Sequence, residues 1–463
     1  MQGIDQSIFK AYDIRGVYPK QIDADLVYKI ARAYVRFLQM DGHGSVTNGL
    51  TQMRIAVGTD MRLCGEEFKQ AATRGLVDAG VDVVDLGLIS TDQMYFGVVH
   101  LKLDGGIMAT ASHNPAEYGG LKLVREQSRP ISGDSGIYQI RDLVISNFQF
   151  PISNVKGGVK KVDIKDAYYE HVLRPFDISK FKPLKIVANA NFGMANPAIE
   201  KLKTILPVKF IKVLNDHLDG NFPKGPSDPL LPSNRPETIA AIKELKPDLG
   251  VAWDGDGDRC FFFDELGEFI TPAYINALLS EYYLKKHPGG KVLHDTRVVR
   301  VIDDAVARNG GVSVMTKAGH SFIKERMIAE QAIFGNETSG HYYFKENFYL
   351  DNGLIPFLAV LDVISLSNRP FSEILRPLRE KFYISEEINF EYSNKNILEV
   401  IKQKYQDAEI DNMDGYDFNY PDWRFNLRLS NTQNLLRLNL ETNNAKLLKQ
   451  KTDEVVSFIN SIK

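Results

Sequence analysis

Three stretches of the chain repeat one order of hydrophobic and polar positions, at residues 54–87, 184–214 and 291–319. Each begins with a short apolar run, continues with apolar positions at helical spacing, and ends with a second apolar run. Gly80 and Gly310 follow the first and third helical segments, where helix C-caps are expected. The pattern predicts three strand–helix–strand units of an α/β fold.

A further helix, a short apolar strand and a polar loop follow each unit. The loops are Ser112–Pro115, Asp254–Arg259 and Asn336–His341. Open α/β sheets bind ligands at the carboxyl ends of their strands, so we expect three related domains that present these loops to one composite site. The alternative is three independent α/β domains whose loops have unrelated roles. The number of chemically capable side chains in all three loops favours the composite site.

The C-terminal part has a different order of elements. A strand is expected over 384–392, a helix over 395–405, polar turns after it, two alternating β runs over 423–430 and 434–442, and a final helix. This order predicts an α+β module. The fold class expected is therefore α/β, with three related α/β domains and a C-terminal α+β domain. The expected domains are 1–155, 156–258, 259–370 and 371–463.

Composition narrows the classes of function. With 463 residues, 44% hydrophobic and 25% charged, the chain has the profile of a soluble globular protein of about three domains. Lys and Arg number 56 and Asp and Glu 59, so no global positive field exists to hold nucleic acid or an anionic membrane. The charge balance is compatible with a local basic pocket for a small phosphorylated ligand. Cys64 and Cys260 alone exclude a disulfide framework and a cysteine zinc cluster.

Targeting signals are not evident in the sequence. The first residues show no basic segment followed by an apolar one. The most apolar stretch, 354–366, is interrupted by Asp362 and is too short to span a bilayer. The expected location is the cytoplasm.

Asp254, Asp256 and Asp258 alternate with two glycines. Three carboxylates this close repel one another unless a cation lies between them, and oxygen ligands favour Mg²⁺ or Ca²⁺. The spacing resembles an EF-hand, with Glu265 at the twelfth position, but Arg259 stands where that loop requires glycine, and the flanks read as strands. We therefore predict a metal site without an EF-hand. A solvated acidic turn is less favoured, because the glycines let the loop fold tightly around an ion.

Ser112 follows a small apolar strand and precedes an Asn-Pro turn signal. It is either a nucleophile or a turn former. His113 is a poor partner on this reading, because neighbouring side chains on an extended chain point apart. A metal site nearby favours phosphoryl transfer over acyl transfer.

Two other loops carry weaker signals. The segment Arg428–Gln433 offers a guanidinium, hydroxyls and an amide suited to phosphate, or it is an ordinary hairpin loop. Glu337, Ser339 and His341 lie among glycines and suit vicinal sugar hydroxyls, or form a simple turn. His320 is a candidate acid or base, although a lone histidine is more often structural.

In combination, the motifs TASHNP, DGDGDR, GNETSGH and RLSNT, in this order, resemble the α-D-phosphohexomutase superfamily. Further segments, including FKAYDIRG at residues 9–16 and GHSFIKERM at residues 319–327, look like bacterial phosphomannomutases. The resemblance covers essentially the whole chain. It implies four domains around a cleft, the fourth similar to the TATA-binding protein.

The resemblance also implies the chemistry. Ser112 would carry a phosphate, and Mg²⁺ would be held by it and by Asp254, Asp256 and Asp258. Mannose 6-phosphate and mannose 1-phosphate would interconvert through a hexose 1,6-bisphosphate, which also serves as activator. A phosphoglucomutase or a dual-specificity phosphohexomutase is the alternative, and a phosphoglucosamine mutase is less favoured. A non-catalytic sugar-phosphate-binding protein is disfavoured, because the serine, aspartates and phosphate-loop donors are all present.

Individual roles follow from the same resemblance. The expected catalytic residues are Ser112, His113, Lys122, Arg259 and His320. The expected substrate-binding residues are Tyr12, Arg15, Glu337, Ser339, His341, Arg428, Ser430, Asn431 and Thr432. The expected partners are small hexose phosphates, with neither nucleic acid nor membrane, and the expected assembly is a monomer or homodimer.

Overall fold

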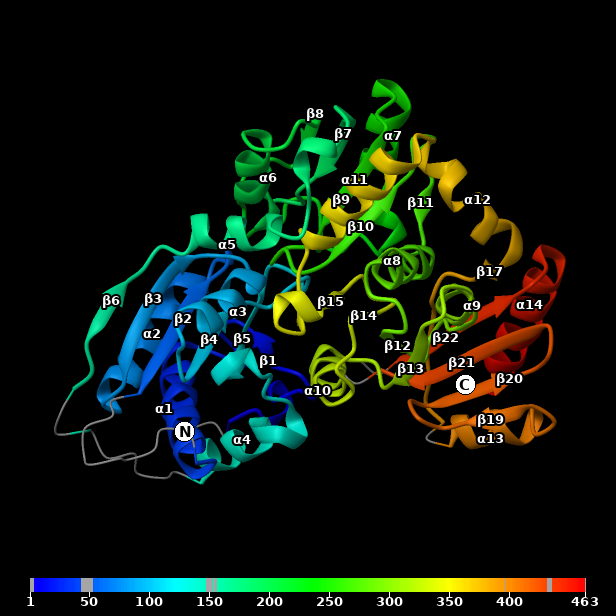
Figure 1. Cartoon of the computed structure of the whole chain (residues 1–463). Helices are drawn as coiled ribbons and strands as arrows, with labels where there is room; N and C mark the ends of the chain where they lie inside the picture. Colours follow the sequence, from blue (N-terminus) through cyan, green and yellow to red (C-terminus); the bar gives the residue numbers. More distant parts are fainter. Residues whose placement is uncertain are drawn as a thin grey trace. The chain divides into compact units, whose positions relative to one another are not determined.

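The structure is a computed structural model that describes residues 4–42, 53–146, 153, 156–394, 396–430 and 435–462. The chain divides into two compact units. Figure 1 shows their helices and strands. Unit 1 contains Met1–Phe261 and Leu350–Leu358, and unit 2 contains Phe262–Tyr349 and Ala359–Lys463. The boundaries fall inside strand β10 (Cys260–Phe263) and helix α11 (Ile355–Ser367).

The first sheet of unit 1 has the strand order β1-β5-β4-β2-β3-β6. Its strands are β1 (Ile14–Val17), β2 (Arg54–Thr59), β3 (Asp82–Leu88), β4 (Gly105–Ala109), β5 (Tyr118–Arg125) and β6 (Val159–Lys161). Strand β2 runs parallel to β3 and β4, whereas β5 is antiparallel to β4 and β1. The unit predicted over 54–87 is confirmed as β2, helix α2 (Gly65–Asp78) and β3.

Four further helices accompany this sheet in the described part of the chain: α1 (Ala24–Met40), α3 (Thr91–His100), α4 (Tyr138–Ile145) and α5 (Lys165–Leu173). Helix α1 begins at Asp23, whose carboxylate accepts a hydrogen bond from Leu26 N. Helices α1 and α2 pack closely because Gly75 has no side chain: a Cβ there would lie 2.7 Å from Tyr28 O. The expected C-cap is confirmed at Gly80, which has a φ of 84°.

Strands β7 (Lys185–Asn189), β8 (Lys209–Leu214) and β9 (Leu249–Trp253) of unit 1 are the parallel strands of the second sheet, with β7 parallel to both neighbours. Helices α6 (Ala195–Lys203) and α7 (Pro236–Leu245) connect them, so the unit predicted over 184–214 is confirmed. Trp253 ends β9 fully buried, and its indole N–H donates to Gly353 O at 2.7 Å. This bond fixes the end of the strand that leads into the aspartate loop. The short strand β16 (Leu350–Asp351) also belongs to unit 1.

Unit 2 begins with the antiparallel pair of β10 and β11 (Phe269–Ile270) and helix α8 (Pro272–Lys286). Its α/β sheet contains β12 (Lys291–Asp295), β13 (Val312–Thr316), β14 (Phe334–Asn336) and β15 (Tyr342–Phe344), in the order β13-β12-β14-β15. Helices α9 (Arg300–Arg308), α10 (His320–Glu330) and α12 (Phe371–Lys381) complete this part. The third predicted unit is thus confirmed as β12, α9 and β13. Among the described helices none is long and apolar enough to cross a membrane.

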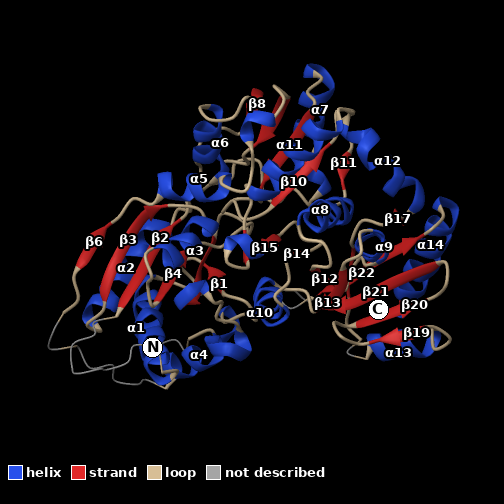
Figure 2. Ribbon diagram, viewed as in Figure 1, coloured by secondary structure: helices blue, strands red, loops and turns tan. Residues whose placement is uncertain are grey.

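The C-terminal sheet of unit 2 has the order β17-β22-β21-β20-β19 (Figure 2). Strand β18 also pairs with β22. The elements of this part are β17 (Tyr383–Ile384), β18 (Ile388–Glu391), α13 (Ile397–Lys404), β19 (Glu409–Asp411), β20 (Tyr416–Asn419), β21 (Trp423–Leu429), β22 (Leu435–Thr442) and α14 (Ala445–Ile462). The polar turns expected after residue 405 are therefore partly wrong, since β19 and β20 lie there. The apolar residues of these two short strands lie among Asp, Asn and Gly, so their alternation is hard to recognise in the sequence. Phe418 of β20 is nevertheless fully buried in the C-terminal core.

Candidate functional site

The residues of the site in unit 1 lie where parallel strands end. Strands β2, β3 and β4 run parallel, so their carboxyl ends share one edge of the sheet. Asp60 and Arg62 follow β2, Thr91 follows β3, and Ser112 follows β4. The sequence reading missed Asp60, Arg62 and Thr91. Their position just after a parallel strand was the available signal.

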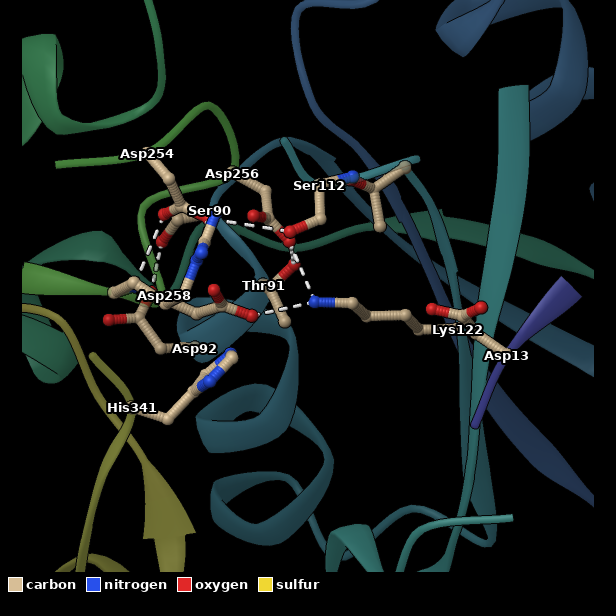
Figure 3. A network of polar contacts seen from close by, with 12 residues as sticks. Asp13, Ser90, Thr91, Asp92, Ser112, Lys122, Asp254, Asp256, Asp258 and His341 are labelled. Carbon is tan, nitrogen blue, oxygen red and sulfur yellow. Dashed lines mark hydrogen bonds and ion pairs between the residues drawn. The ribbon is translucent and has the colours of Figure 1, made fainter. Parts of the chain in front are cut away.

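Ser112 is buried, and its backbone adopts the left-handed conformation with a φ of 50°. Its Oγ lies 3.2 Å from His113 Nδ1 and 3.3 Å from Asp254 Oδ2 (Figure 3). The expectation that the Ser112 and His113 side chains point apart is wrong, because it assumed an extended chain. A residue at positive φ breaks the alternation of neighbouring side chains.

Arg62 fixes the main chain around Ser112. Its Nη2 donates to the carbonyl oxygens of Ser112 at 2.8 Å and Asn114 at 2.6 Å. Its Nη1 donates to the carbonyl oxygens of Pro115 at 2.9 Å and Tyr118 at 3.0 Å. One buried guanidinium thus binds carbonyls that face inward, and a loop that would otherwise leave them unsatisfied is held in one shape.

Asp60 supports the same loop from the other side. Ser112 N donates to Thr110 Oγ1 at 2.9 Å, and that hydroxyl donates to Asp60 Oδ2 at 2.6 Å. Burial raises the pKa of Asp60 to about 6, although Arg62 and the Thr110 hydroxyl oppose the shift. Arg15 adds a further bond, from its Nη1 to Asn114 Oδ1 at 2.7 Å. The serine loop is therefore held by one side chain of β1 and by side chains that directly follow β2 and β4.

The three aspartates of the DGDGD loop are fully buried, and one carboxylate oxygen of each lies within 4.8 Å of the others. Glycines make this shape possible. Gly257 has a φ of 80°, and a Cβ on Gly193 would lie 2.5 Å from Gly255 O. Met194 N donates to the same oxygen at 2.8 Å. The loop is tightly packed, which argues against the solvated acidic turn.

Two cations neutralise part of this acidic cluster. Lys122 Nζ lies 2.8 Å from Asp256 Oδ2 and 2.6 Å from Asp258 Oδ2. Burial alone would lower the pKa of Lys122, but the two carboxylates outweigh it and raise that pKa well above its ordinary value. Arg259 Nε lies 2.8 Å from Asp254 Oδ2. Both candidate cations are thus charged and directed at the aspartates.

The donor set fits a divalent cation. Three buried carboxylates face the two cations Lys122 and Arg259, so a further positive charge among them would stabilise all three in the ionised form. Asp256 Oδ1 is buried and has no hydrogen-bond partner among the described residues. Thr91 Oγ1 donates to the other oxygen, Asp256 Oδ2, at 2.5 Å and leaves Oδ1 to a ligand. Hard carboxylate oxygens suit Mg²⁺ or Ca²⁺.

Glu337 is the centre of the sugar-loop candidates in unit 2. Its Oε1 accepts from Gly319 N at 2.9 Å, and its Oε2 accepts from Tyr343 OH at 2.6 Å. Burial would raise the pKa of Glu337, but His341, Arg297 and Tyr343 together lower it well below its usual range. Glu337 is therefore a fixed carboxylate, with lone pairs left for further donors.

The remaining candidates of this unit are partly described. Ser339 Oγ lies 3.0 Å from His341 Nδ1, and His320 begins α10 directly after Gly319, which binds Glu337. Arg428 is buried on β21, and Ser430 N donates to Leu435 O at 2.8 Å. Asn431 and Thr432 lie outside the described residues. Tyr12, in unit 1, precedes β1 and is half-buried.

Comparison with known proteins assigns the domains that carry these loops to one family. Profiles described as phosphoglucomutase/phosphomannomutase, alpha/beta/alpha domains I, II and III match residues 6–148, 166–267 and 271–382. A phosphomannomutase of Vibrio cholerae serotype O1 is 43% identical over 464 residues, covering 98% of each chain. Phosphohexose mutases of Xanthomonas campestris pv. campestris are 43% identical over 459 residues, covering 97% of this chain and 98% of theirs.

The solved structures agree as well. A phosphoglucomutase/phosphomannomutase family protein from Burkholderia thailandensis superposes with a TM-score of 0.86 at 31% identity, covering 99% of this chain and 98% of its own. The expected fold class is confirmed, with three α/β/α domains followed by a β-rich fourth. The chain belongs to the phosphoglucomutase/phosphomannomutase family.

Proposed function

We propose that the protein is an isomerase that interconverts mannose 6-phosphate and mannose 1-phosphate. The observation that carries this proposal is the buried hydroxyl of Ser112. It lies 3.3 Å from Asp254, in a loop that one arginine holds by several main-chain oxygens. Placing a nucleophile in a fixed position among charged groups is what phosphoryl transfer requires of an enzyme. The relatives support mannose as the sugar, since several that are 41% to 43% identical are named phosphomannomutases.

In this proposal Ser112 Oγ carries the phosphoryl group that is exchanged. A hydroxyl of the hexose phosphate attacks that phosphorus while its proton passes to a basic side chain of the site. The bond from phosphorus to Ser112 Oγ breaks as that oxygen takes up a proton, and a hexose 1,6-bisphosphate results. The bisphosphate then reorients, and its other phosphate returns to Ser112. Added hexose 1,6-bisphosphate acts as activator, because it phosphorylates any enzyme that has lost the group.

Asp254, Asp256 and Asp258 would hold Mg²⁺, together with the phosphate carried by Ser112. The metal ion would stabilise the negative charge on the phosphoryl group during its transfer. Lys122 and Arg259 act in the same direction, as fixed cations bonded to the aspartates. His113 Nδ1, at 3.2 Å from Ser112 Oγ, can hold the proton of that hydroxyl when serine is unphosphorylated.

In this proposal the substrate is recognised by side chains of unit 2 and by two residues near the start of unit 1. Glu337, Ser339 and His341 bind sugar hydroxyls, and His320 takes part in proton transfer. Arg428 and Ser430, with Asn431 and Thr432, bind the phosphate that does not react. The proposed substrate-facing residues near Ser112 are Tyr12 and Arg15. We propose that the protein acts in the cytoplasm as a monomer or homodimer.

A coupled assay tests the function. The purified full chain receives Mg²⁺, a trace of hexose 1,6-bisphosphate, and in turn mannose 1-phosphate, glucose 1-phosphate and glucosamine 1-phosphate. Faster turnover of the mannose substrate supports the proposal, comparable rates on glucose would make the protein a dual-specificity phosphohexomutase, and no turnover would refute it. Ser112→Ala should abolish turnover, whereas Ser461→Ala, an exposed serine of α14, should leave it unchanged.

A further inference from the structure

A long connection joins β8 to α7 in unit 1, and its residues 219–228 are called the brace loop below. The turns of this loop are fixed from within. Asp219 Oδ1 accepts a hydrogen bond from Asn221 N at 2.9 Å, and Asp219 O accepts one from Phe222 N at 3.2 Å. Phe222 O in turn accepts from Gly225 N at 2.9 Å. The brace loop therefore has a defined shape of its own.

The side chain of Phe222 is held inside the protein. It is buried, with 4% of its surface exposed, although its backbone has a φ of 45°. The left-handed region is unfavourable for a bulky residue and persists only where surrounding contacts determine it. Residues strained in this way are concentrated at functional sites, so the contacts of the ring indicate what the strain serves.

The first contact of the ring is with Arg62, the arginine that holds the serine loop. Arg62 Cζ lies over the ring of Phe222, 5.1 Å from its centroid. A guanidinium is attracted to the face of an aromatic ring. The bonds from Arg62 to the serine loop lie in the plane of the guanidinium, so the ring can cover one face without displacing them. Phe222 thus supports the serine loop through Arg62.

The second contact of the ring is with the aspartate loop. A Cβ on Gly255 would lie 3.3 Å from Phe222 Cζ, so the tip of the ring packs against the main chain of this loop. The same Cβ would lie 2.8 Å from Ser112 O and 2.5 Å from Ser227 Oγ. The serine loop, the aspartate loop and the brace loop therefore meet at Gly255.

The two ends of the brace loop contact the same two regions. A Cβ on Gly220 would lie 2.5 Å from Met61 O and 2.9 Å from Leu63 N, so the brace loop lies directly on the segment after β2. At the other end, Asp228 Oδ1 lies 3.3 Å from Arg259 Nη1, and Arg259 directly follows the aspartate loop. Movement of the brace loop would therefore disturb both regions.

We propose that Phe222 is a positioning residue for phosphoryl transfer, whose ring sets the spacing of the serine and aspartate loops by filling the space between Arg62 and Gly255. This inference rests on the proposed function. Ser112 Oγ lies 3.3 Å from Asp254 Oδ2, and this distance depends on the spacing of the two loops. Small errors in the placement of reacting groups reduce the rate of a reaction strongly. Phe222 should therefore affect both kcat and Mg²⁺ binding, although it offers no ligand atom.

Phe222→Leu tests the proposal, because leucine keeps an apolar side chain but lacks the flat face and the length of the ring. With mannose 1-phosphate, the full chain should show a kcat lower by about tenfold or more and a KM changed by less than about threefold. Calorimetric titration with Mg²⁺ alone should give a Kd higher by about threefold or more, because the aspartate loop loses a packing neighbour. Hydrogen–deuterium exchange should become faster in residues 110–118 and 254–259 and stay unchanged in α2.

Phe348→Leu is the matched control, since Phe348 also has a positive φ, of 58°, but keeps 37% of its surface exposed. It should leave all these measurements unchanged, and thermal melting should show which variants fold. If Phe222→Leu does not fold, Gly220→Ala takes its place. The new Cβ would push the brace loop away from Met61, and the same changes in kcat, Mg²⁺ binding and exchange are expected.

The inference is overturned if folded Phe222→Leu keeps the wild-type kcat, or if a higher KM is its only effect. A double-mutant cycle adds a further test. The combined variant Arg62→Gln/Phe222→Leu should lose less kcat than the product of the two single losses, because the ring acts through the arginine. A loss equal to that product would overturn the inference. Failure of the proposed function would appear separately, as absence of turnover in the wild type, while Mg²⁺ titration and exchange still decide whether Phe222 holds the two loops.

Discussion

Arg62 Nη2 lies 2.8 Å from the main-chain oxygen of Ser112, and the two residues come from the ends of adjacent parallel strands. Three further carbonyl oxygens of the serine loop accept from the same guanidinium. The position of the proposed reactive oxygen therefore depends on an arginine whose hydrogen bonds to this loop go to main-chain oxygens. Arg62 is a positioning residue in this sense.

Arg62→Gln should lower kcat by about tenfold or more and change KM by less than about threefold. The amide cannot bond all four oxygens, so Ser112 Oγ loses its fixed position, and small errors in the placement of a nucleophile reduce rate more than binding. Steady-state kinetics with mannose 1-phosphate would measure both constants. Arg36→Gln, an exposed arginine of α1, is the matched control. An Arg62→Gln variant with wild-type kcat would show that the loop keeps its shape without the arginine.

Mg²⁺ should stabilise the protein against heat, and EDTA should remove this effect. A ligand that binds only the folded state at about 100 times its Kd adds about 2.7 kcal/mol to the free energy of unfolding. Differential scanning calorimetry of the wild type with Mg²⁺ and with EDTA would show a higher Tm with the metal. The difference should disappear in Asp256→Asn, whose amide cannot replace the carboxylate Oδ1. It should persist in Asp142→Asn, an exposed aspartate of α4. Equal Tm values with and without Mg²⁺ in the wild type would contradict the metal site.

Gly193→Ala should weaken Mg²⁺ binding although Gly193 has no ligand atom. The new Cβ would lie 2.5 Å from Gly255 O and 2.9 Å from Asp254 O, so the aspartate loop has to move. Overpacking of this kind costs about 1–3 kcal/mol, which corresponds to roughly a 5- to 150-fold loss of affinity if the loop takes up the strain. Activity measured against Mg²⁺ concentration would give the shift.

Gly158→Ala is the control for this variant, because the nearest atom to its Cβ would be the Asp82 carboxylate at 3.3 Å. It should need no more Mg²⁺ than the wild type. The same Mg²⁺ requirement in Gly193→Ala and the wild type would mean that the loop tolerates the methyl group.

The strand–helix–strand units were predictable from the sequence because apolar periodicity determines them directly. Strands β19 and β20 were not, since each is short and lies among turn-forming residues, and they are held in the sheet by the pairing of β20 with β21 and of β19 with β20. The site shows the same division. Ser112 and the aspartates stand in recognisable local motifs, whereas Arg62 and Thr91 act across the sheet edge, and their partners are distant in sequence. The contact of Ser112 with His113 required the positive φ of Ser112, which the local sequence did not indicate.

Asp92, in the first turn of α3, makes the stability of unit 1 depend on pH. It is buried, and Tyr168 OH donates to its Oδ2 at 2.5 Å, while Ser90 Oγ and Gln93 N donate to its Oδ1. Burial raises the pKa of Asp92 to about 7, the negative charge of Asp258 adds to this, and the hydrogen bonds from Ser90 and Tyr168 oppose it. In the unfolded chain the pKa of an aspartate is about 4.

The folded protein therefore binds this proton up to about pH 7, and the unfolded chain releases it above about pH 4. The contribution of Asp92 to stability is complete below pH 4 and is lost as the pH rises to about 7. Asp92→Asn removes this dependence, since the amide stays neutral. The free energy of unfolding of Asp92→Asn, relative to the wild type, should rise between pH 4.5 and pH 7.5, by about 1.4 kcal/mol for each unit of pKa shift. Urea unfolding at several pH values would measure it, with exposed Asp216→Asn as the control. A constant difference across this range would show that Asp92 is ionised in the folded protein throughout, because the hydrogen bonds from Ser90 and Tyr168 then outweigh the cost of burial.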